Sequence, residues 1–133
     1  MPGLAYLDSS AMAKLLIPER ESNALEAAIL DKDGLFSSRL CIAECGRALM
    51  RAGREASGDA VDDVFGAFVL LDLPITLLQT AGRFQPARLR ALDAIHVSTA
   101  LSLADSNVEF ITYDQRLADA ARANGLTVVQ PGI

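Results

Sequence analysis

"LAYLDSSAMAKLLIPE" (residues 4–19) changes its hydrophobic pattern at Asp8. The preceding residues, 4–7, form a continuous apolar run that is typical of a buried strand. After Asp8 the sequence turns to small hydroxyl residues, and residues 10–17 then have the spacing of a short helix that Pro18 stops or kinks. A carboxylate therefore stands where a buried strand ends and a helix begins.

The rest of the chain alternates predicted helices and strands in the same way. Gly53 and Gly125 close two of the helices, because glycine readily takes the left-handed conformation of a helix end. The expected elements are a helix over 19–30, a turn at 31–34, a strand at 35–37, helices over 39–53 and 57–71, a strand at 73–76, a largely buried helix over 91–104, a strand at 108–114, a helix over 115–125 and a strand at 126–129. This alternation predicts an α/β fold with a mostly parallel central sheet of four to five strands, covered by helices on both faces.

The length of 133 residues and the 51% content of hydrophobic residues predict a single domain over 1–133. No basic and apolar leader opens the chain, and no apolar run approaches the roughly 18 to 20 residues that span a bilayer. Cys41 and Cys45 lack the spacing of a secreted disulfide framework. We therefore expect a soluble cytoplasmic protein with free thiols and no membrane partner.

The net charge of −5 argues against a broad surface for polyanions, because phosphate binding draws on Lys and Arg. With 5% aromatic residues and no Trp, the chain also lacks a wide platform for base stacking. Arginines nevertheless gather in two short stretches, Arg47, Arg51, Arg54 and Arg83, Arg88, Arg90. Any contact with nucleic acid is therefore expected to be local.

Two acids are predicted to share one end of the sheet. Asp8 closes the first strand and Asp114 closes the strand within 108–114, each directly before a helix. In open parallel sheets, ligands bind beyond the carboxyl ends of the strands, where the order of connection reverses. If these two strands are neighbours, about 4.8 Å apart, both side chains can face one crevice. Each acid alone also has a structural interpretation, because Asp is a favoured helix N-cap.

Two further acids interrupt apolar surroundings, Glu44 in "CIAECGRAL" and Asp93 in "LRALDAIHV". A charge buried there without a partner would be costly. Glu44 has a surface partner available in Arg47 at i+3, and Asp93 has a structural interpretation as the cap of the helix that follows. If all four acids converge, their mutual repulsion approaches ~10 kcal/mol, which rivals the ~5 to 15 kcal/mol stability of a small domain. Such a cluster needs cations or shared protons.

Mg²⁺ and Mn²⁺ suit an all-carboxylate site, because these hard ions accept oxygen ligands and keep several waters. A water whose pKa the ion lowers can attack a phosphodiester, and the ion offsets the charge that develops on the phosphate. Convergence of the four acids would therefore indicate metal-dependent hydrolysis of a phosphate ester.

Four segments, in this order, resemble those of the PIN-domain ribonucleases and, within them, of the VapC toxins of bacterial and archaeal toxin–antitoxin pairs. "YLDSSAMAKLLIPE" is similar to the family's opening strand and helix, "IAECGRAL" to its second segment, "LRALDAIHVSTAL" to its third and "FITYDQRLADAA" to its fourth. The likeness covers about residues 4–129. The matching acids are Asp8, Glu44, Asp93 and Asp114, accompanied by the hydroxyl residues Ser10 and Thr112.

This resemblance implies a PIN-like three-layer α/β/α fold in which Asp8, Glu44, Asp93 and Asp114 hold Mg²⁺ or Mn²⁺ and cleave RNA endonucleolytically. It also implies a homodimer and a VapB-like antitoxin, with which a larger assembly forms and whose C-terminal tail occludes the groove. The fourth acid is the most variable position of the family. Asp119, five residues after Asp114, is a second candidate that we expect to face solvent instead.

Arg47 and Arg51 follow Glu44 at i+3 and i+7, and Arg54 or Glu55 extends the same stripe along a helix. The stripe would run outward from the metal. We interpret it either as a guide for the RNA backbone or as an ordinary solvated helix face.

His96 lies three residues after Asp93 and so shares its helical face. It is a candidate for contact with an RNA phosphate. The alternative is a core histidine that is satisfied by a hydrogen bond.

Two functions of other classes stay open. Receiver domains and haloacid-dehalogenase-like phosphatases also place an Asp after a strand for aspartyl phosphotransfer. Receivers need a Lys after a late strand, whereas this chain has only Lys14 and Lys32, and the phosphatases use D-x-D, whereas Asp8 is followed by Ser9 and Ser10. The second alternative is a non-catalytic binding module on the PIN fold, in which the acids serve as caps or relics.

Overall fold

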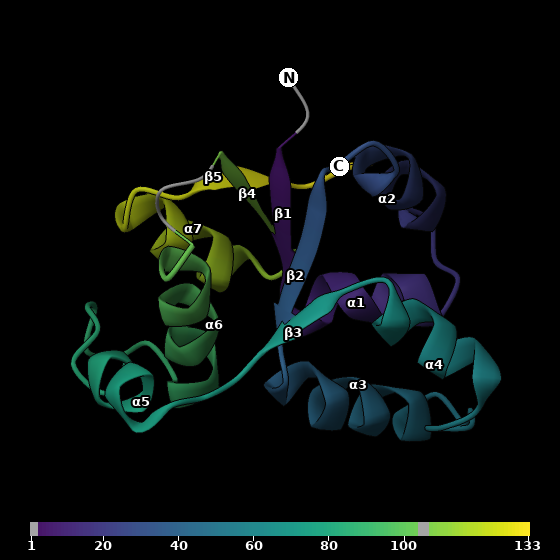
Figure 1. Cartoon of the computed structure of the whole chain (residues 1–133), viewed down its shortest axis with the longest axis horizontal. Helices are drawn as coiled ribbons and strands as arrows, with labels where there is room; N and C mark the ends of the chain where they lie inside the picture. The colour runs from purple at the N-terminus through teal and green to yellow at the C-terminus, as the bar shows by residue number, and fades with distance from the viewer. Residues whose placement is uncertain (1–2, 104–106) are drawn as a thin grey trace.

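β1 (Leu4–Leu7) lies at the centre of the sheet in the computed structural model, which describes residues 3–103 and 107–133. Within those residues the sheet has five strands in the order β3-β2-β1-β4-β5 (Figure 1). The others are β2 (Gly34–Ser38), β3 (Val69–Leu71), β4 (Val108–Ile111) and β5 (Thr127–Val129). Neighbouring strands are parallel throughout, which confirms the predicted α/β sheet.

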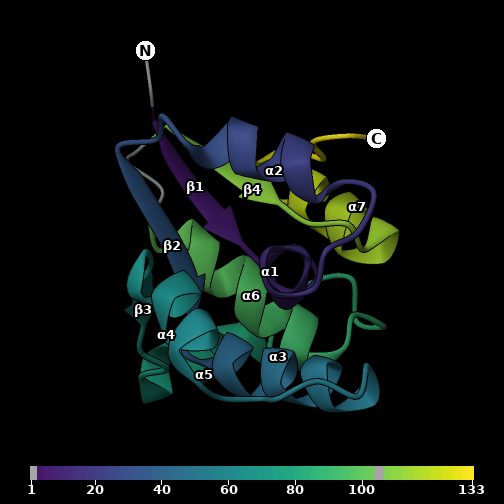
Figure 2. The same ribbon diagram turned by 90° about the vertical axis from the view of Figure 1, so that its right-hand side faces the viewer.

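Helices cover both faces of this sheet, as Figures 1 and 2 show. One layer consists of α1 (Ser9–Leu16), α2 (Ser22–Ile29), α3 (Leu40–Arg51) and α4 (Asp59–Gly66). The other consists of α6 (Ala91–Leu101), α7 (Gln115–Ala123) and α5 (Ile75–Ala81), which packs against α6. This is the three-layer arrangement that the resemblance implies. In the described part of the chain, none of these helices is long and apolar enough to cross a membrane.

The central strands bury side chains on both faces. In β1, Ala5 and Leu7 belong to the core shared with α1, α2 and α3. Tyr6 points to the opposite face, where its ring stacks on Phe110 of β4 with centroids 5.4 Å apart. Burial on both faces explains why the strand reads as a continuous apolar run in the sequence.

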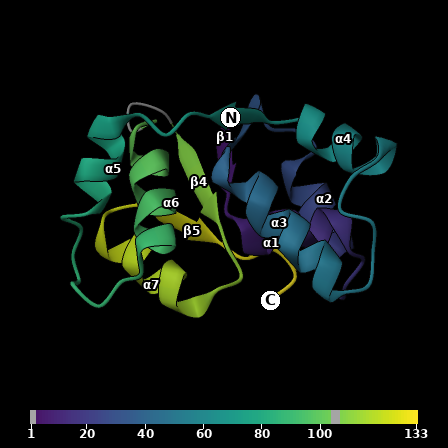
Figure 3. The ribbon, with the colours of Figure 1, turned by 90° about the horizontal axis from the view of Figure 1, so that it is seen from below.

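The order of connection reverses between β1 and β4. The register pairs Leu7 with Ile111, so the residues that follow them, Asp8 and Thr112, emerge side by side. Asp8 N also donates a hydrogen bond to Ile111 O at 3.2 Å. The predicted neighbours are therefore confirmed, and the carboxyl ends of both strands open at the end of the molecule that Figure 3 views from below.

The segment over 57–76 differs from the prediction. The predicted helix 57–71 is shorter, since α4 ends at Gly66 and residues 69–71 form β3, and the predicted strand at 73–76 is wrong, because α5 begins there. β3 pairs with β2, and a short apolar run looks alike in a strand and a helix by periodicity alone. Pro74, with a φ of −66°, has no N–H for a sheet ladder and instead stands at the start of α5.

The remaining helix ends agree closely with the sequence. Gly53 and Gly125 have φ values of 71° and 86°, which confirms the conformation predicted for closing a helix. The predicted helix within 91–104 ends at Leu101, and residue 104 lies outside the described residues.

Candidate active site

Asp8 is fixed at the end of β1 by hydrogen bonds to both of its carboxylate oxygens. Oδ1 accepts from Ser10 Oγ at 2.7 Å and from Ala11 N at 3.0 Å, and Oδ2 accepts from Thr112 Oγ1 at 2.7 Å. The bond from Ala11 caps α1, so the N-cap interpretation is confirmed. Only 3% of Asp8 is exposed, and this burial raises the pKa of its carboxyl. The carboxylate is thus costly to bury and rigidly held.

The turn after β4 is hydrogen-bonded to the residues that follow β1. Besides donating to Asp8, Thr112 Oγ1 accepts from Asp114 N at 3.1 Å. Tyr113 N donates to Ser10 Oγ at 2.9 Å, and the hydroxyls of Ser10 and Thr112 lie 3.2 Å apart. The two hydroxyl residues therefore connect the first acid with the segment that carries the fourth.

Asp114 caps α7 and keeps one oxygen available. Its Oδ1 accepts from Arg116 N at 2.9 Å and from Leu117 N at 3.3 Å, which confirms the N-cap interpretation for this acid as well. Within residues 3–103 and 107–133, no protein group donates to Oδ2. Asp119, the other candidate for the fourth acid, pairs with Arg122 at 3.5 Å and has 80% of its side chain exposed, as predicted.

Asp93 lies in the first turn of α6 without capping it. The N-cap residue is Arg90, whose side chain makes no capping hydrogen bond, so the capping interpretation of Asp93 is wrong. The nearest cation is the Arg90 guanidinium, whose Nε is 3.9 Å away. Burial raises the pKa of the Asp93 carboxyl, the charges of Asp114 and Glu44 raise it further, and Arg90 lowers it. Asp93 is therefore crowded by like charges.

Glu44 is bound by a buried histidine rather than by an arginine. His96 Nε2 lies 2.7 Å from Glu44 Oε1, and its Nδ1 lies 2.8 Å from the Tyr6 hydroxyl. The predicted surface pair with Arg47 is therefore wrong. His96 is 1% exposed and both ring nitrogens have partners, which agrees with the core-histidine alternative, whereas its contact with RNA stays a prediction. The histidine instead fixes the direction of the Glu44 carboxylate.

All four acids, Asp8, Glu44, Asp93 and Asp114, line one cavity of about 330 Å³ at the carboxyl ends of the strands. Side chains from the end of β1, from α3, from α6 and from the turn after β4 thus line the same cavity. No group of three or more His, Cys, Asp or Glu residues within 3–103 and 107–133 is arranged to hold a metal ion by itself. A hydrated Mg²⁺ suits such spacing, because it takes one or two carboxylates directly and keeps several waters.

A second cavity beside α3, of about 490 Å³, carries the arginine stripe. Its lining includes Glu44, Arg47 and Arg51 together with Ser10. Because Glu44 and Ser10 also line the acid cavity, the two cavities are adjacent. The stripe is shorter than predicted, since α3 ends at Arg51 and Arg54 lies beyond it.

Two residues of the site were missed from the sequence. Tyr6 supports His96 from a position 90 residues earlier, and nothing local in the sequence signals such a contact. Arg90 lines the acid cavity and is the nearest cation to Asp93. Its place three residues before Asp93, on a helix start, is a signal that could have identified it.

Comparisons with known proteins agree with this geometry. The PIN domain model matches residues 5–123. The chain is 40% identical to Ribonuclease VapC46 of Mycobacterium tuberculosis over 126 residues, which are 95% of this chain and 96% of that protein. It is 35% identical to Ribonuclease VapC35 of the same organism, over 97% of this chain and 98% of that protein. The crystal structure of M. tuberculosis VapC20, described as a sarcin–ricin loop cleaving toxin, has the same fold, with a TM-score of 0.71 at 14% identity over 96% of this chain and 99% of that one. The chain therefore belongs to the PIN-domain family and, within it, to the VapC ribonucleases.

Proposed function

We propose that this chain is a metal-dependent endoribonuclease and the toxin of a toxin–antitoxin pair, with Asp8, Glu44, Asp93 and Asp114 as its catalytic acids. The observation that carries the proposal is the single cavity that all four acids line. The relatives named as VapC ribonucleases support RNA as the substrate. The reaction is hydrolysis of a phosphodiester bond.

Mg²⁺ is the cofactor that we propose, with Mn²⁺ as a substitute. The donors in the cavity are carboxylate oxygens, because the single histidine is bound to Glu44 and Tyr6. Oxygen donors suit these hard ions. When bound, the ion would activate water and offset the negative charge on the phosphate. The raised pKa of Asp93 supports this assignment, since a cation would relieve the crowding by like charges.

Each acid contributes through its own contacts. The bonds from Ser10 and Thr112 hold Asp8 in one rotamer, so its position is set before the ion arrives. His96 orients Glu44 in the same way. The less constrained Asp93 is free to adjust as ion and substrate bind. Asp114 caps α7 through its Oδ1, which fixes it as well. Three fixed carboxylates and the less constrained Asp93 combine preorganisation with room for a hydrated ion.

The proposal is tested by incubating the purified chain with an end-labelled single-stranded RNA in Mg²⁺, in Mn²⁺ and in EDTA. We expect discrete cuts with either ion and none in EDTA. Because water is the nucleophile rather than the 2′-hydroxyl of the RNA, the new ends should carry a linear phosphate and a hydroxyl. Cyclic phosphate ends, or cuts that persist in EDTA, would contradict the proposal.

A VapB-like antitoxin and a second copy of the chain are the proposed partners. Large apolar side chains are exposed on α3 and α5, at 50% for Ile42, 58% for Met50 and 73% for Ile75. Covering them in a homodimer or in a toxin–antitoxin assembly would remove apolar surface from water.

We place the protein in the cytoplasm, where a reducing environment keeps the free Cys41 and Cys45 as thiols.

Arg47 and Arg51 are proposed to guide the RNA backbone along the cavity beside α3. Replacing both with Ala should weaken RNA binding and reduce the slope of log affinity against log salt by about 0.7 for each lost phosphate contact. Fluorescence anisotropy in EDTA measures binding without cleavage. A variant with Arg20→Ala and Arg39→Ala removes the same charge from exposed sites elsewhere. An unchanged affinity of the Arg47 and Arg51 variant would reject this role.

Aspartyl phosphotransfer is less well supported by the geometry. Lys14 pairs with Glu21 at 3.2 Å and Lys32 with Glu109 at 2.9 Å, and neither lysine lines the acid cavity. Both oxygens of Asp8 accept hydrogen bonds, which makes the carboxylate a poorer nucleophile toward a phosphoryl donor. The cleavage assay in EDTA and Mg²⁺ separates the nuclease from a non-catalytic binding module.

A further inference from the structure

A third cavity, of about 460 Å³, lies between the segment 86–90 and α7. Its apolar lining includes Pro86, Leu89 and Ala120, and its charged lining includes Arg88, Arg90 and Arg116. Arg90 and Asp93 line both this cavity and the acid cavity, so the two are adjacent. Its volume falls in the range of small-molecule sites, roughly 300 to 1,000 Å³.

The arginines of this cavity are poorly neutralised. Over residues 3–103 and 107–133, neither Arg88 nor Arg116 has a carboxylate within 4.0 Å, and the nearest carboxylate oxygen to Arg90 is 3.9 Å from its Nε. Asp119 also lines the cavity, but it pairs with Arg122 at 3.5 Å. Positive charge therefore collects directly beside the negative acid cavity. An anion held there would lie next to the catalytic acids.

The chemistry of the lining matches a nucleotide. Ala120 is buried and Leu89 is half-buried, which gives an apolar surface for a base. The guanidinium groups can bind a phosphate and stack their planes on a base. Among the described residues that line the cavity there is no aromatic side chain, so stacking on arginine has to replace stacking on a ring. A nucleotide can place its base on the apolar surface and its phosphate on the arginines.

We propose that this cavity is a binding subsite for the unpaired nucleotide that flanks the scissile phosphate. The base lies against Leu89 and Ala120, and its phosphate is bound by Arg88 and Arg116. This inference rests on the proposed function, because the bound nucleotide belongs to the same RNA that the acid cavity cleaves. Double-stranded RNA buries its bases in the helix, so the subsite restricts cleavage to single strands, loops and bulges.

The test is the variant with Arg88→Ala and Arg116→Ala, assayed with short RNAs that differ only in the nucleotides beside the cut. Both arginines lie outside the acid cavity, so kcat should stay within about twofold. KM should rise about tenfold, because contacts to a phosphate are lost. The preference for the nucleotide beside the cut should also weaken.

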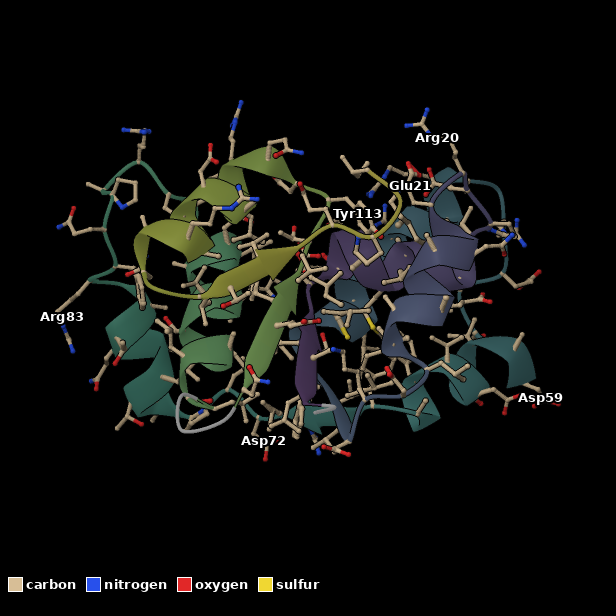
Figure 4. All side chains as sticks on the ribbon, turned by 90° about the horizontal axis from the view of Figure 1, so that it is seen from above. Arg20, Glu21, Asp59, Asp72, Arg83 and Tyr113 are labelled. Atoms are coloured by element: carbon tan, nitrogen blue, oxygen red, sulfur yellow. The ribbon has the colours of Figure 1, made fainter. Side chains whose placement is uncertain are left out.

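The matched control is the variant with Arg20→Ala and Arg39→Ala, which removes the same charge away from α7. Figure 4 labels Arg20 and Asp72, the ion-pair partner of Arg39. The KM of this control variant should stay within about twofold of that of the wild type. A second variant, Ala123→Phe, fills the cavity without changing charge and should raise KM as well. Unchanged KM and unchanged nucleotide preference in both cavity variants would overturn the subsite, as would an equal rise of KM in the control.

RNA binding in EDTA distinguishes a failure of the subsite from a failure of the proposed function. If the wild-type chain does not cleave RNA, the proposed function fails. The affinities of the variants for RNA in EDTA then still test the subsite. Weaker binding by the Arg88 and Arg116 variant than by the control supports it, and equal binding overturns it.

Discussion

Replacing Asp93 with Asn should lower the rate of RNA cleavage by about 10³-fold, which corresponds to ~4 kcal/mol of transition-state stabilisation. Asp93 lines the acid cavity, and its nearest cation, the Arg90 Nε, is 3.9 Å away. Asn keeps the shape of the side chain and removes the charge that would hold a metal ion. The measurement is the single-turnover rate at saturating Mg²⁺.

The same variant should be at least as stable as the wild type without metal. Burial and the neighbouring carboxylates raise the pKa of Asp93, which means that the fold disfavours its ionised form. A neutral Asn removes this unfavourable contribution at pH 7. Urea unfolding therefore should show no loss of stability while cleavage is lost.

Asp59→Asn is the matched control for Asp93→Asn. Asp59 also lies in the first turn of a helix, α4, and Figure 4 shows it at the outer edge of the molecule. Both substitutions remove the interaction of a carboxylate with a helix N-terminus, typically below ~1 kcal/mol, which at Asp93 is outweighed by unfavourable burial. The Asp59 variant should cleave at the wild-type rate. Wild-type cleavage by Asp93→Asn, or its unfolding, would contradict the assignment of Asp93.

The position of the acids could be predicted because parallel strands share an edge at their carboxyl ends. Asp8 directly follows β1, whereas β4 ends at Ile111 instead of 114 as predicted, and Asp114 lies in the turn that follows it. Once β1 and β4 are neighbours, the two acids must approach each other. Both also cap helices, so the structural and the functional interpretations of these residues hold together.

The segment over 57–76 could not be predicted, since its sequence pattern is ambiguous. Val69–Leu71 is a short apolar run, and only its pairing with β2 makes it a strand. The β-branched residues after Pro74 suggest a strand, but they belong to α5. Tertiary pairing thus overrides local preference at the edge of the sheet.

The supports of the site escaped prediction because they join distant segments. Tyr6 of β1 meets His96 of α6, which covers that face of the sheet, and His96 reaches Glu44 on α3. Arg88 was visible as part of an arginine-rich stretch, but only the packing of α7 brings Arg116 beside it. Sequence patterns identify residues on one strand end or one helix face, whereas these contacts depend on how the layers pack.

Adding Mn²⁺ to the metal-free chain should raise its Tm by about 10 °C at an ion concentration of 100 Kd, because binding to the folded state alone contributes ~2.7 kcal/mol. Mn²⁺ offsets the repulsion among carboxylates in the acid cavity. Asp8→Asn should abolish most of this gain. Asn keeps an oxygen for Ala11 N and presents an amide to the Thr112 hydroxyl, which can accept instead of donate, so the fold should survive.

The gain in Tm should also depend on pH. Burial raises the pKa of Asp8 and of Asp93 above the ordinary value of 3.8. Between 3.8 and the raised pKa values, the folded state therefore binds more protons than the unfolded state. Stability from these two groups therefore falls as pH rises through that window, and the ion competes with protons within it. Differential scanning fluorimetry with and without Mn²⁺ should give the largest gain near pH 7.5 and a smaller gain near pH 4.5. The difference in Tm with and without Mn²⁺ at each pH removes the contribution of ion pairs elsewhere. One such pair is Lys14 with Glu21, in which the lysine lowers the pKa of the glutamate and whose contribution weakens in acid. A gain that is independent of pH, or retained in Asp8→Asn, would place the bound ion outside the acid cavity.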